Sequence, residues 1–210
     1  MSADLDDLRR DMRKRRRALS AGERERAARE VAGTVARTIA RHYRAGRGTR
    51  VAAYLSTASE LATNPLLELA HERGWQVFVP AVVSARGGRM RFVPLSAELH
   101  LNRFGIPEPA VRAVRGSTGW VDARWLDLAF VPLLAAGPRG ERLGSGAGFY
   151  DRAFAFLRGR SAWHKPVLIG LAYDFQRIPA LARAPWDVPL DALITERALY
   201  RFSNRLASVP

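Results

Sequence analysis

The chain has 210 residues, of which 48% are hydrophobic and 26% are charged. This length and balance fit one globular domain with a substantial core. No run approaches the ~18 apolar residues that a membrane-spanning helix needs, and we expect no signal peptide. The chain has no cysteine, which excludes disulfides, thiolate metal sites and cysteine nucleophiles. We therefore expect a cytoplasmic protein without a membrane partner.

The formal net charge is +14, and every basic residue except Lys14 and Lys165 is an arginine. A charge of this sign is typical of proteins that bind nucleic acid, nucleotide phosphates or polyglutamate tails. The arginines are scattered through the whole chain, however, as they also are in proteins encoded by arginine-rich genomes. The charge alone therefore does not identify the partner.

Residues 5–19 carry apolar side chains at helical spacing, which predicts an amphipathic helix. Its other side holds the basic run Arg13–Arg17, which we interpret as a solvated helix face. Ser20 and Glu23 then form a capping box that begins a second helix. This second helix is predicted to end near Gly46.

Beyond residue 50, short apolar runs separated by turn residues predict alternating strands and helices. Strands are predicted at residues 51–55, 76–79, 90–93, 126–131, 166–172 and 190–194. Helices are predicted at residues 64–74, capped by Asn64, and at residues 149–157. This alternation is typical of a mainly parallel sheet covered on both faces. We predict a three-layer α/β/α fold in one domain over residues 1–210, with residues 1–46 as a helical segment packed on the sheet.

The stretch RLGSGAGFYDR, from Arg142 to Arg152, joins a predicted strand to a predicted helix. Its glycines let backbone amides approach a ligand, and the following helix offers a partial positive charge at its N-terminus. Together with Arg142, these features predict a phosphate cradle. The spacing fits neither a Walker loop nor a dinucleotide fingerprint, and the alternative is a tight turn into a helix.

Asp151 lies in the first turn of the helix that follows this loop. It either complements the helix dipole or holds Mg²⁺ beside bound phosphates. A metal site needs a second carboxylate, and Asp187 and Asp191 stand just before the last predicted strand. In a parallel sheet such positions can converge on one crevice.

Several segments of this chain, in the same order along the sequence, resemble the 5-formyltetrahydrofolate cyclo-ligase family. The resemblance covers nearly the whole length. The matching segments are LRRDMRKRRRALSAGER, AAYLSTASELATNPLLELAHERGWQVFVPAV, FGIPEP, VPLLAAGPRGERLGSGAGFYDRAF, IGLAYDFQ and WDVPLDALITE. The resemblance implies an enzyme that uses ATP and Mg²⁺ to convert 5-formyltetrahydrofolate into 5,10-methenyltetrahydrofolate, ADP and phosphate. It also implies that ATP phosphorylates the formyl oxygen before the folate N10 attacks. We expect a monomer that acts on a reduced folate, with or without a polyglutamate tail, and has no nucleic-acid partner.

The resemblance also implies roles for individual positions. Arg142, Tyr150 and Asp151 would take part in catalysis, and Asp151 and Asp187 would hold the metal. The residues that would line the ATP site are Arg9, Arg142, Leu143, Gly144, Ser145, Gly146, Ala147, Gly148, Phe149 and Tyr150. The residues that would contact the folate are Glu60, Phe104, Ser145, Gly146, Ala147, Gly148 and Phe149. Thr63 would support the segment of Glu60, and Phe104 is alternatively a core residue.

Some positions depart from the family pattern. Leu5 stands where many members have lysine, Ala147 occupies the centre of the loop, and Trp186 precedes Asp187 in place of histidine. Two other functions remain open from the sequence. One is a basic, non-catalytic nucleic-acid binder on the same fold, although the Arg13–Arg17 run lacks interleaved aromatics for base stacking. The other is an ATP-dependent ligase or kinase for a related heterocycle.

Overall fold

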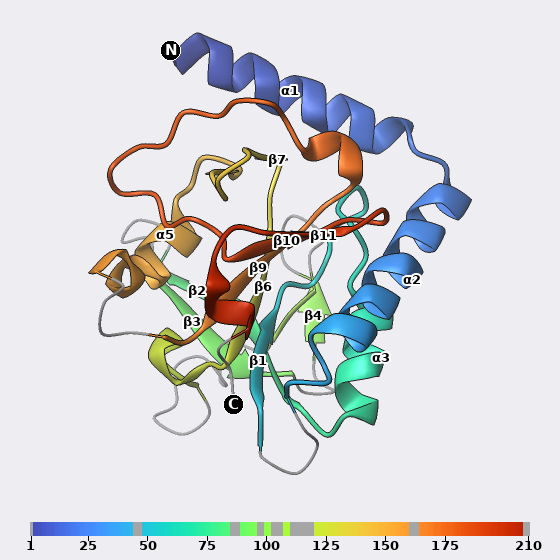
Figure 1. Ribbon diagram of the computed structural model, residues 1–210, viewed down its shortest axis with the longest axis vertical. Coiled ribbons are helices and arrows are strands. Elements are labelled where there is room, and N and C mark those ends of the chain that lie inside the picture. The colour runs from blue at the N-terminus through green and yellow to red at the C-terminus, as the bar shows by residue number, and fades with distance from the viewer. Residues whose placement is uncertain are drawn as a thin grey trace.

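The computed structural model describes residues 2–43, 48–84, 89–95, 99–101, 107–109, 120–159 and 164–207. Strands form a central sheet that is flanked and capped by helices (Figure 1). The helices are α1 (Ser2–Ala18), α2 (Ala21–Thr38), α3 (Asn64–Glu72) and α5 (Phe149–Ala153), with short 3-10 helices at Ala123–Trp125, Ala155–Gly159, Asp174–Gln176 and Asn204–Ala207. The strands are β1 (Arg50–Ala53), β2 (Gln76–Ser84), β3 (Arg89–Pro94), β4 (Leu99–Leu101), β5 (Pro107–Pro109), β6 (Leu128–Pro132), β7 (Ala135–Ala136), β8 (Arg142–Leu143), β9 (Val167–Leu171), β10 (Ala192–Ile194) and β11 (Leu199–Arg201).

The central sheet has seven strands in the order β11-β10-β9-β6-β1-β2-β3. The five inner strands are parallel, and the two edge strands β11 and β3 are antiparallel to their neighbours. The prediction of a mainly parallel sheet is therefore confirmed. All five parallel strands end at the same edge of the sheet, which is where α/β proteins of this type bind ligands.

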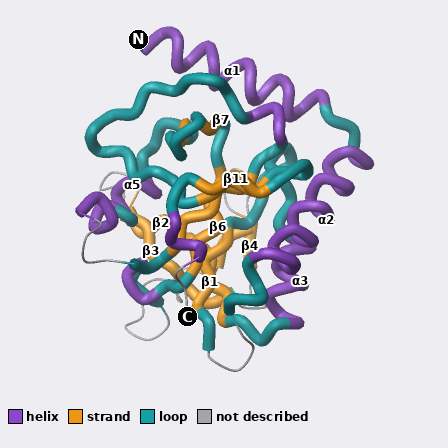
Figure 2. The backbone as a smooth tube through the Cα atoms, in the orientation of Figure 1, coloured by secondary structure: helices purple, strands orange, loops and turns teal. Residues whose placement is uncertain are grey.

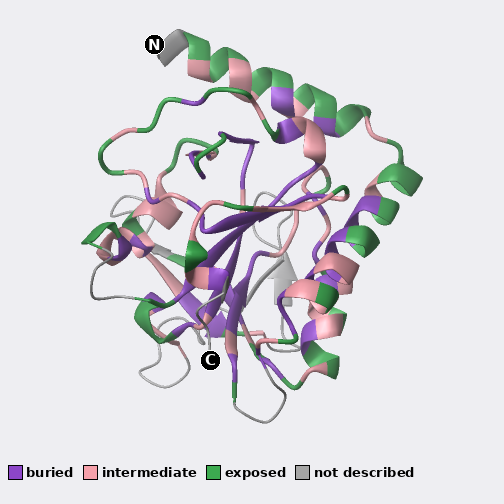
Figure 3. Ribbon diagram, in the orientation of Figure 1, coloured by how far each residue is buried: buried purple, intermediate pink, exposed green. Residues whose placement is uncertain are grey.

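Successive residues of the inner strands enter two different cores. In β1, Val51 and Ala53 lie in the core shared with α2 and α3, whereas Ala52 lies in the core shared with α5 and the 3-10 helix after it. Strands buried on both faces explain why these segments read as continuous apolar runs in the sequence. Figure 3 shows the inner strands as buried, and helix α2 as buried along one side only.

Helix α1 lies across the carboxyl edge of the sheet, away from the two faces (Figure 1). Its residue Met12 packs against Leu134 and Leu143, which follow β6, and against Leu181. Leu181 belongs to the long connection between β9 and β10, which passes beside α1 (Figure 2). The N-terminal helix therefore covers the carboxyl ends of the strands.

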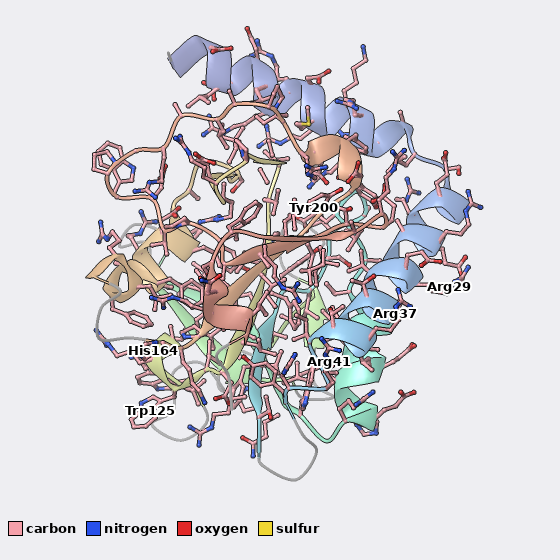
Figure 4. The ribbon with its side chains drawn as sticks, in the orientation of Figure 1. Arg29, Arg37, Arg41, Trp125, His164 and Tyr200 are labelled. Atoms are coloured by element: carbon pink, nitrogen blue, oxygen red, sulfur yellow. The ribbon has the colours of Figure 1, made fainter. Side chains whose placement is uncertain are left out.

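The outer surface of the helical layer is charged. Arg29, Arg37 and Arg41 are exposed and lie on the outer side of α2 and of the turn after it (Figure 4). Arg29 pairs with Glu25 on the same helix. No helix among the described residues is both long enough and apolar enough to cross a membrane.

Several predicted boundaries differ in the structure. The capping box of Ser20 and Glu23 is confirmed, but α2 ends at Thr38, before Gly46. The prediction that Asn64 caps α3 is wrong, because Asn64 is the first helical residue and Thr63 is the N-cap. The predicted helix over residues 149–157 is an α-helix to Ala153 followed by a 3-10 helix. Strands β4, β5, β7, β8 and β11 were not predicted.

Candidate active site at the carboxyl edge of the sheet

The glycine loop, residues 144–148, connects β8 to α5. Gly146 and Gly148 have φ angles of 106° and 65°, a left-handed conformation that side chains with a Cβ adopt only with strain. Ser145, Gly146 and Ala147 are exposed, and their amides donate no hydrogen bond to any residue that the structure describes. The loop therefore presents unpaired backbone donors ahead of a helix N-terminus, which is an arrangement suited to an anion.

Arg142 and Asp151 form an ion pair between the two ends of this loop. Arg142 Nη2 donates to Asp151 Oδ1 at 2.7 Å, and the two side chains are 7% and 22% exposed. The guanidinium also lies 5.7 Å from the centre of the Tyr150 ring. The Arg142 guanidinium and the Asp151 carboxylate thus fix each other's orientation beside the loop, and the Tyr150 ring contacts the guanidinium.

Asp151 also reaches the segment that contains Asp187. Val188 N donates to Asp151 Oδ1 at 3.3 Å, so the residue next to Asp187 contacts Asp151 directly. The Asp187 side chain closes its own turn, because its Oδ2 accepts from Ala184 N at 2.8 Å. The structure therefore brings these two predicted metal ligands onto adjacent segments.

The described residues contain no group of three or more metal-ligating side chains. Two carboxylates on adjacent segments nevertheless fit Mg²⁺, which prefers a few protein oxygens and completes its shell with phosphate oxygens and water. Asp191, the third acid considered, is not available for such a role. It is fully buried, where it accepts from Leu168 N at 2.9 Å and from Ser203 Oγ at 2.7 Å.

Helix α1 contributes Arg9 to the glycine loop. Arg9 Nε donates to Gly144 O at 3.1 Å, and its Nη1 pairs with Asp6 at 2.6 Å. The Arg9 guanidinium of helix α1 thus lies against the loop that is predicted to hold phosphates. Leu5 is instead partly buried in the apolar contact of α1 with Leu134 and Leu143.

Glu60 lies in the connection from β1 to α3, and several hydrogen bonds fix this connection. Glu60 Oε2 accepts from Thr57 N at 2.9 Å, and Glu60 O accepts from the Tyr173 hydroxyl at 3.3 Å. The buried Thr63 hydroxyl donates to Tyr54 O at 2.9 Å, which ties the start of α3 to the end of β1. This hydrogen bond is how Thr63 supports the segment that contains Glu60.

Three tyrosine side chains lie near enough to Glu60 for its charge to affect them. Burial raises the pKa of Tyr54, Tyr150 and Tyr173, and the Glu60 charge raises each of them further. These hydroxyls therefore stay neutral at pH 7 and remain hydrogen-bond donors. The Glu60 charge raises the pKa of Tyr150 and the Arg142 charge lowers it, so both charges act on the helix that follows the glycine loop.

The structure thus gathers Arg9, Glu60, the glycine loop, Tyr150, Asp151 and Asp187 at the carboxyl edge of the sheet. Phe104 lies outside the described residues. The sequence analysis missed Arg16, which belongs to the run interpreted as a solvated face but is buried. Its position four residues after Met12, on the apolar side of the helix, was the signal that indicates burial.

The fold and this arrangement define an α/β protein whose candidate ligand site lies beyond the ends of parallel strands, beside a glycine-rich loop. The model of the 5-formyltetrahydrofolate cyclo-ligase family matches residues 1–196. The chain belongs to this family, and it is an enzyme.

Curated relatives and solved structures agree with this assignment. The 5-formyltetrahydrofolate cyclo-ligase of Escherichia coli K12 is 33% identical over 156 residues, which cover 72% of this chain and 80% of the relative. The cyclo-ligase of Haemophilus influenzae is 31% identical over 143 residues, covering 67% of this chain and 72% of the relative. The solved 5,10-methenyltetrahydrofolate synthetase of Aquifex aeolicus superposes with a TM-score of 0.74 at 28% identity, covering 94% of this chain and 92% of that one.

Proposed function

We propose that this protein uses ATP and Mg²⁺ to cyclise 5-formyltetrahydrofolate to 5,10-methenyltetrahydrofolate, with release of ADP and phosphate. Membership of the cyclo-ligase family carries the proposal. The position of Tyr150 supports it, because the Arg142 guanidinium lies 5.7 Å from the centre of its ring and the Glu60 charge raises its pKa. A reaction between a folate and a nucleotide needs two such neighbouring subsites.

In the proposed reaction, the formyl oxygen attacks the γ-phosphorus of ATP and ADP leaves. The N10 lone pair then attacks the activated formyl carbon, the carbon–oxygen bond to phosphate breaks, and N10 releases its proton. Most of the enzyme's contribution to such a phosphoryl transfer is positioning and charge stabilisation. No covalent intermediate with the protein is required.

The phosphate subsite is assigned to the glycine loop with Arg9 and Arg142. The amides of residues 145–147 have no partner among the described residues and can donate to phosphate oxygens. Arg142 can offer a planar fork to the same group, although it is paired with Asp151 in the structure. Asp151 and Asp187 would hold Mg²⁺, which neutralises the charge of the polyphosphate when bound.

The folate subsite is assigned to the region in front of Glu60. One Glu60 oxygen is held by Thr57 N, and the other has no hydrogen bond to a described residue, so it can accept from the ligand. Tyr54, Tyr150 and Tyr173 supply aromatic rings near Glu60. The Tyr54 and Tyr173 hydroxyls already donate to Leu61 O and Glu60 O, which leaves the Tyr150 hydroxyl as the donor for the ligand among these three. Such a region suits a flat heterocycle that carries amino and amide groups.

The direct test combines the purified protein with ATP, Mg²⁺ and 5-formyltetrahydrofolate. We expect the absorbance of the methenyl product to increase and one ADP to be released for each product molecule. Both signals should vanish without ATP or with EDTA in excess over Mg²⁺. ATP-dependent turnover only with another heterocycle from a substrate panel would favour a related ligase or kinase. RNA binding with a steep salt dependence and no ATP turnover would favour the nucleic-acid binder.

A further inference from the structure

Arg16 is buried, unlike its neighbours in the basic run of helix α1. It is 7% exposed, whereas Arg15 and Arg17 on either side are exposed to solvent. It lies on the side of α1 that faces the ends of the strands, four residues after the buried Met12. Burying a guanidinium is costly unless its charge and its five N–H groups find partners.

The Arg16 guanidinium is only partly paired. Its Nη2 donates to Ser59 Oγ at 3.2 Å, and its Nε has no hydrogen-bond acceptor within the part of the chain that the structure describes. No described carboxylate forms an ion pair with it. Burial lowers the pKa of Arg16, and the nearby Glu60 charge acts in the opposite direction. A buried, charged donor with an unpaired N–H next to the Glu60 region indicates a missing acceptor.

The position of Arg16 on α1 matches that of Arg9. The two residues are seven apart, so they lie on the same side of the helix at roughly 10 Å along its axis. Arg9 contacts the glycine loop through Gly144, and Arg16 contacts the segment of Glu60 through Ser59. One helix therefore presents one guanidinium to each of the two subsites assigned above.

We propose that Arg16 is a substrate-binding residue that donates a hydrogen bond to the 4-oxo group of the pterin, while Glu60 accepts from the neighbouring N3–H and 2-amino groups. The proposal rests on the proposed function. A pterin edge presents two donors and one acceptor side by side, and an adjacent carboxylate and guanidinium match that order. A phosphate or carboxylate ligand is disfavoured at this position, because Glu60 would repel it.

The test compares 5-formyltetrahydrofolate with its 4-amino counterpart, 5-formyl-tetrahydroaminopterin, in which an amino group replaces the 4-oxo group and N3 carries no hydrogen. An amino group at this position cannot accept from Arg16. We expect the wild-type protein to bind the 4-oxo ligand more tightly by at least roughly 10- to 100-fold, because the 4-amino ligand loses both the hydrogen bond from Arg16 and the one from N3–H to Glu60. Equal dissociation constants for the two ligands in the wild-type protein would overturn the proposal.

Arg16→Leu should weaken binding of the 4-oxo ligand by roughly 10- to 100-fold and leave the 4-amino ligand nearly unchanged, so that the preference falls by that factor and only the part due to Glu60 and N3–H remains. A loss of affinity that is equal for both ligands would mean that Arg16 only supports the fold. The exposed Arg17→Leu is the matched control and should keep the wild-type preference. Arg16→Lys, which keeps the charge and a donor, should retain more of the preference than Arg16→Leu and provides a second variant if Arg16→Leu does not fold.

The outcomes separate this proposal from the proposed function. Wild-type protein that turns over 5-formyltetrahydrofolate but does not distinguish the two ligands would overturn the Arg16 assignment alone. Wild-type protein that neither binds nor turns over 5-formyltetrahydrofolate would overturn both. ATP binding, measured separately, should not respond to Arg16→Leu, since Arg16 contacts the segment of Glu60 and Arg9 contacts the glycine loop.

Discussion

The Arg142 guanidinium donates to the Asp151 carboxylate at 2.7 Å, so the residues on either side of the glycine loop are joined by an ion pair. The same carboxylate oxygen accepts from Val188 N at 3.3 Å, so only the other oxygen is unoccupied by described residues. The ion pair places the charge that is assigned to phosphate and the charge that is assigned to the metal in direct contact. Binding of a nucleotide with Mg²⁺ would redistribute these contacts, because both charges would gain stronger partners.

Asp151→Asn should lower turnover by about 100-fold or more while the protein remains folded. The amide keeps a hydrogen-bond acceptor for Arg142 but loses the negative charge that would bind Mg²⁺. The stability cost should be about 1 kcal/mol, typical of one weakened hydrogen bond. Steady-state turnover as a function of Mg²⁺ concentration, with thermal unfolding of the same samples, measures both effects. Normal Mg²⁺-dependent turnover in the variant would remove Asp151 from the site.

Gly146→Ala should lower the affinity for ATP, and this loss should exceed what the small loss of folding stability alone would cause. Gly146 has a φ of 106°, so a Cβ strains the backbone by about 1–3 kcal/mol and also narrows the approach to the loop amides. Gly74→Ala is the matched control, because Gly74 also has a positive φ, of 66°, with no atom within 4 Å of the added Cβ. Calorimetric ATP binding should separate the two variants. If both lose stability and neither changes ATP affinity, the loop is only a tight turn.

Much of the fold followed from local patterns. The capping box of Ser20 and Glu23 and the apolar runs of the inner strands predicted elements that the structure contains. Proline was misjudged at Pro80, where β2 was predicted to stop. Pairing of β1 with β2 ends at Phe78, so beyond it β2 pairs, among the described strands, with β3 alone, and a proline is tolerated at such a half-paired position.

The site was less accessible to sequence reasoning. The glycine loop and Asp151 could be recognised from their own spacing, whereas Glu60 and Asp187 depended on the family resemblance. Arg16 was missed because a run of basic residues hides the one member that continues the apolar side of the helix. Burial of a charged residue depends on tertiary contacts, here those with Ser59 and Glu60, which no local pattern contains.

The stability of the protein should fall above pH 10 in a way that depends on Tyr54. Burial raises the pKa of this hydroxyl well above its ordinary value of 10.0. The folded state therefore keeps the proton when the unfolded state loses it. The stabilisation is complete below the unfolded pKa and is lost as the pH rises toward the folded one.

Tyr54→Phe removes this titration, so its free energy of unfolding should decline less steeply above pH 10, by up to about 1.4 kcal/mol per pH unit. At neutral pH the variant should be less stable by about 1 kcal/mol, because the hydroxyl donates to Leu61 O at 2.9 Å. Denaturant unfolding at a series of pH values measures both quantities. Identical alkaline slopes for the variant and the wild type would contradict the assignment.

The two subsites should respond separately to substitution. Glu60→Gln keeps the shape of the side chain but loses its charge, and should raise KM for 5-formyltetrahydrofolate by roughly 10-fold or more while KM for ATP changes by less than about 2-fold. Glu68→Gln, exposed on α3, is its matched control and should change neither KM value.

Arg142→Ala should do the reverse and raise KM for ATP, because its guanidinium is assigned to phosphate. The exposed Arg158→Ala is the matched control for lost positive charge. Steady-state kinetics with each substrate varied in turn would reveal the split, and direct ATP binding would show whether KM reports affinity. If Glu60→Gln and Arg142→Ala both raise the two KM values equally, Glu60 and the glycine loop do not form distinct subsites.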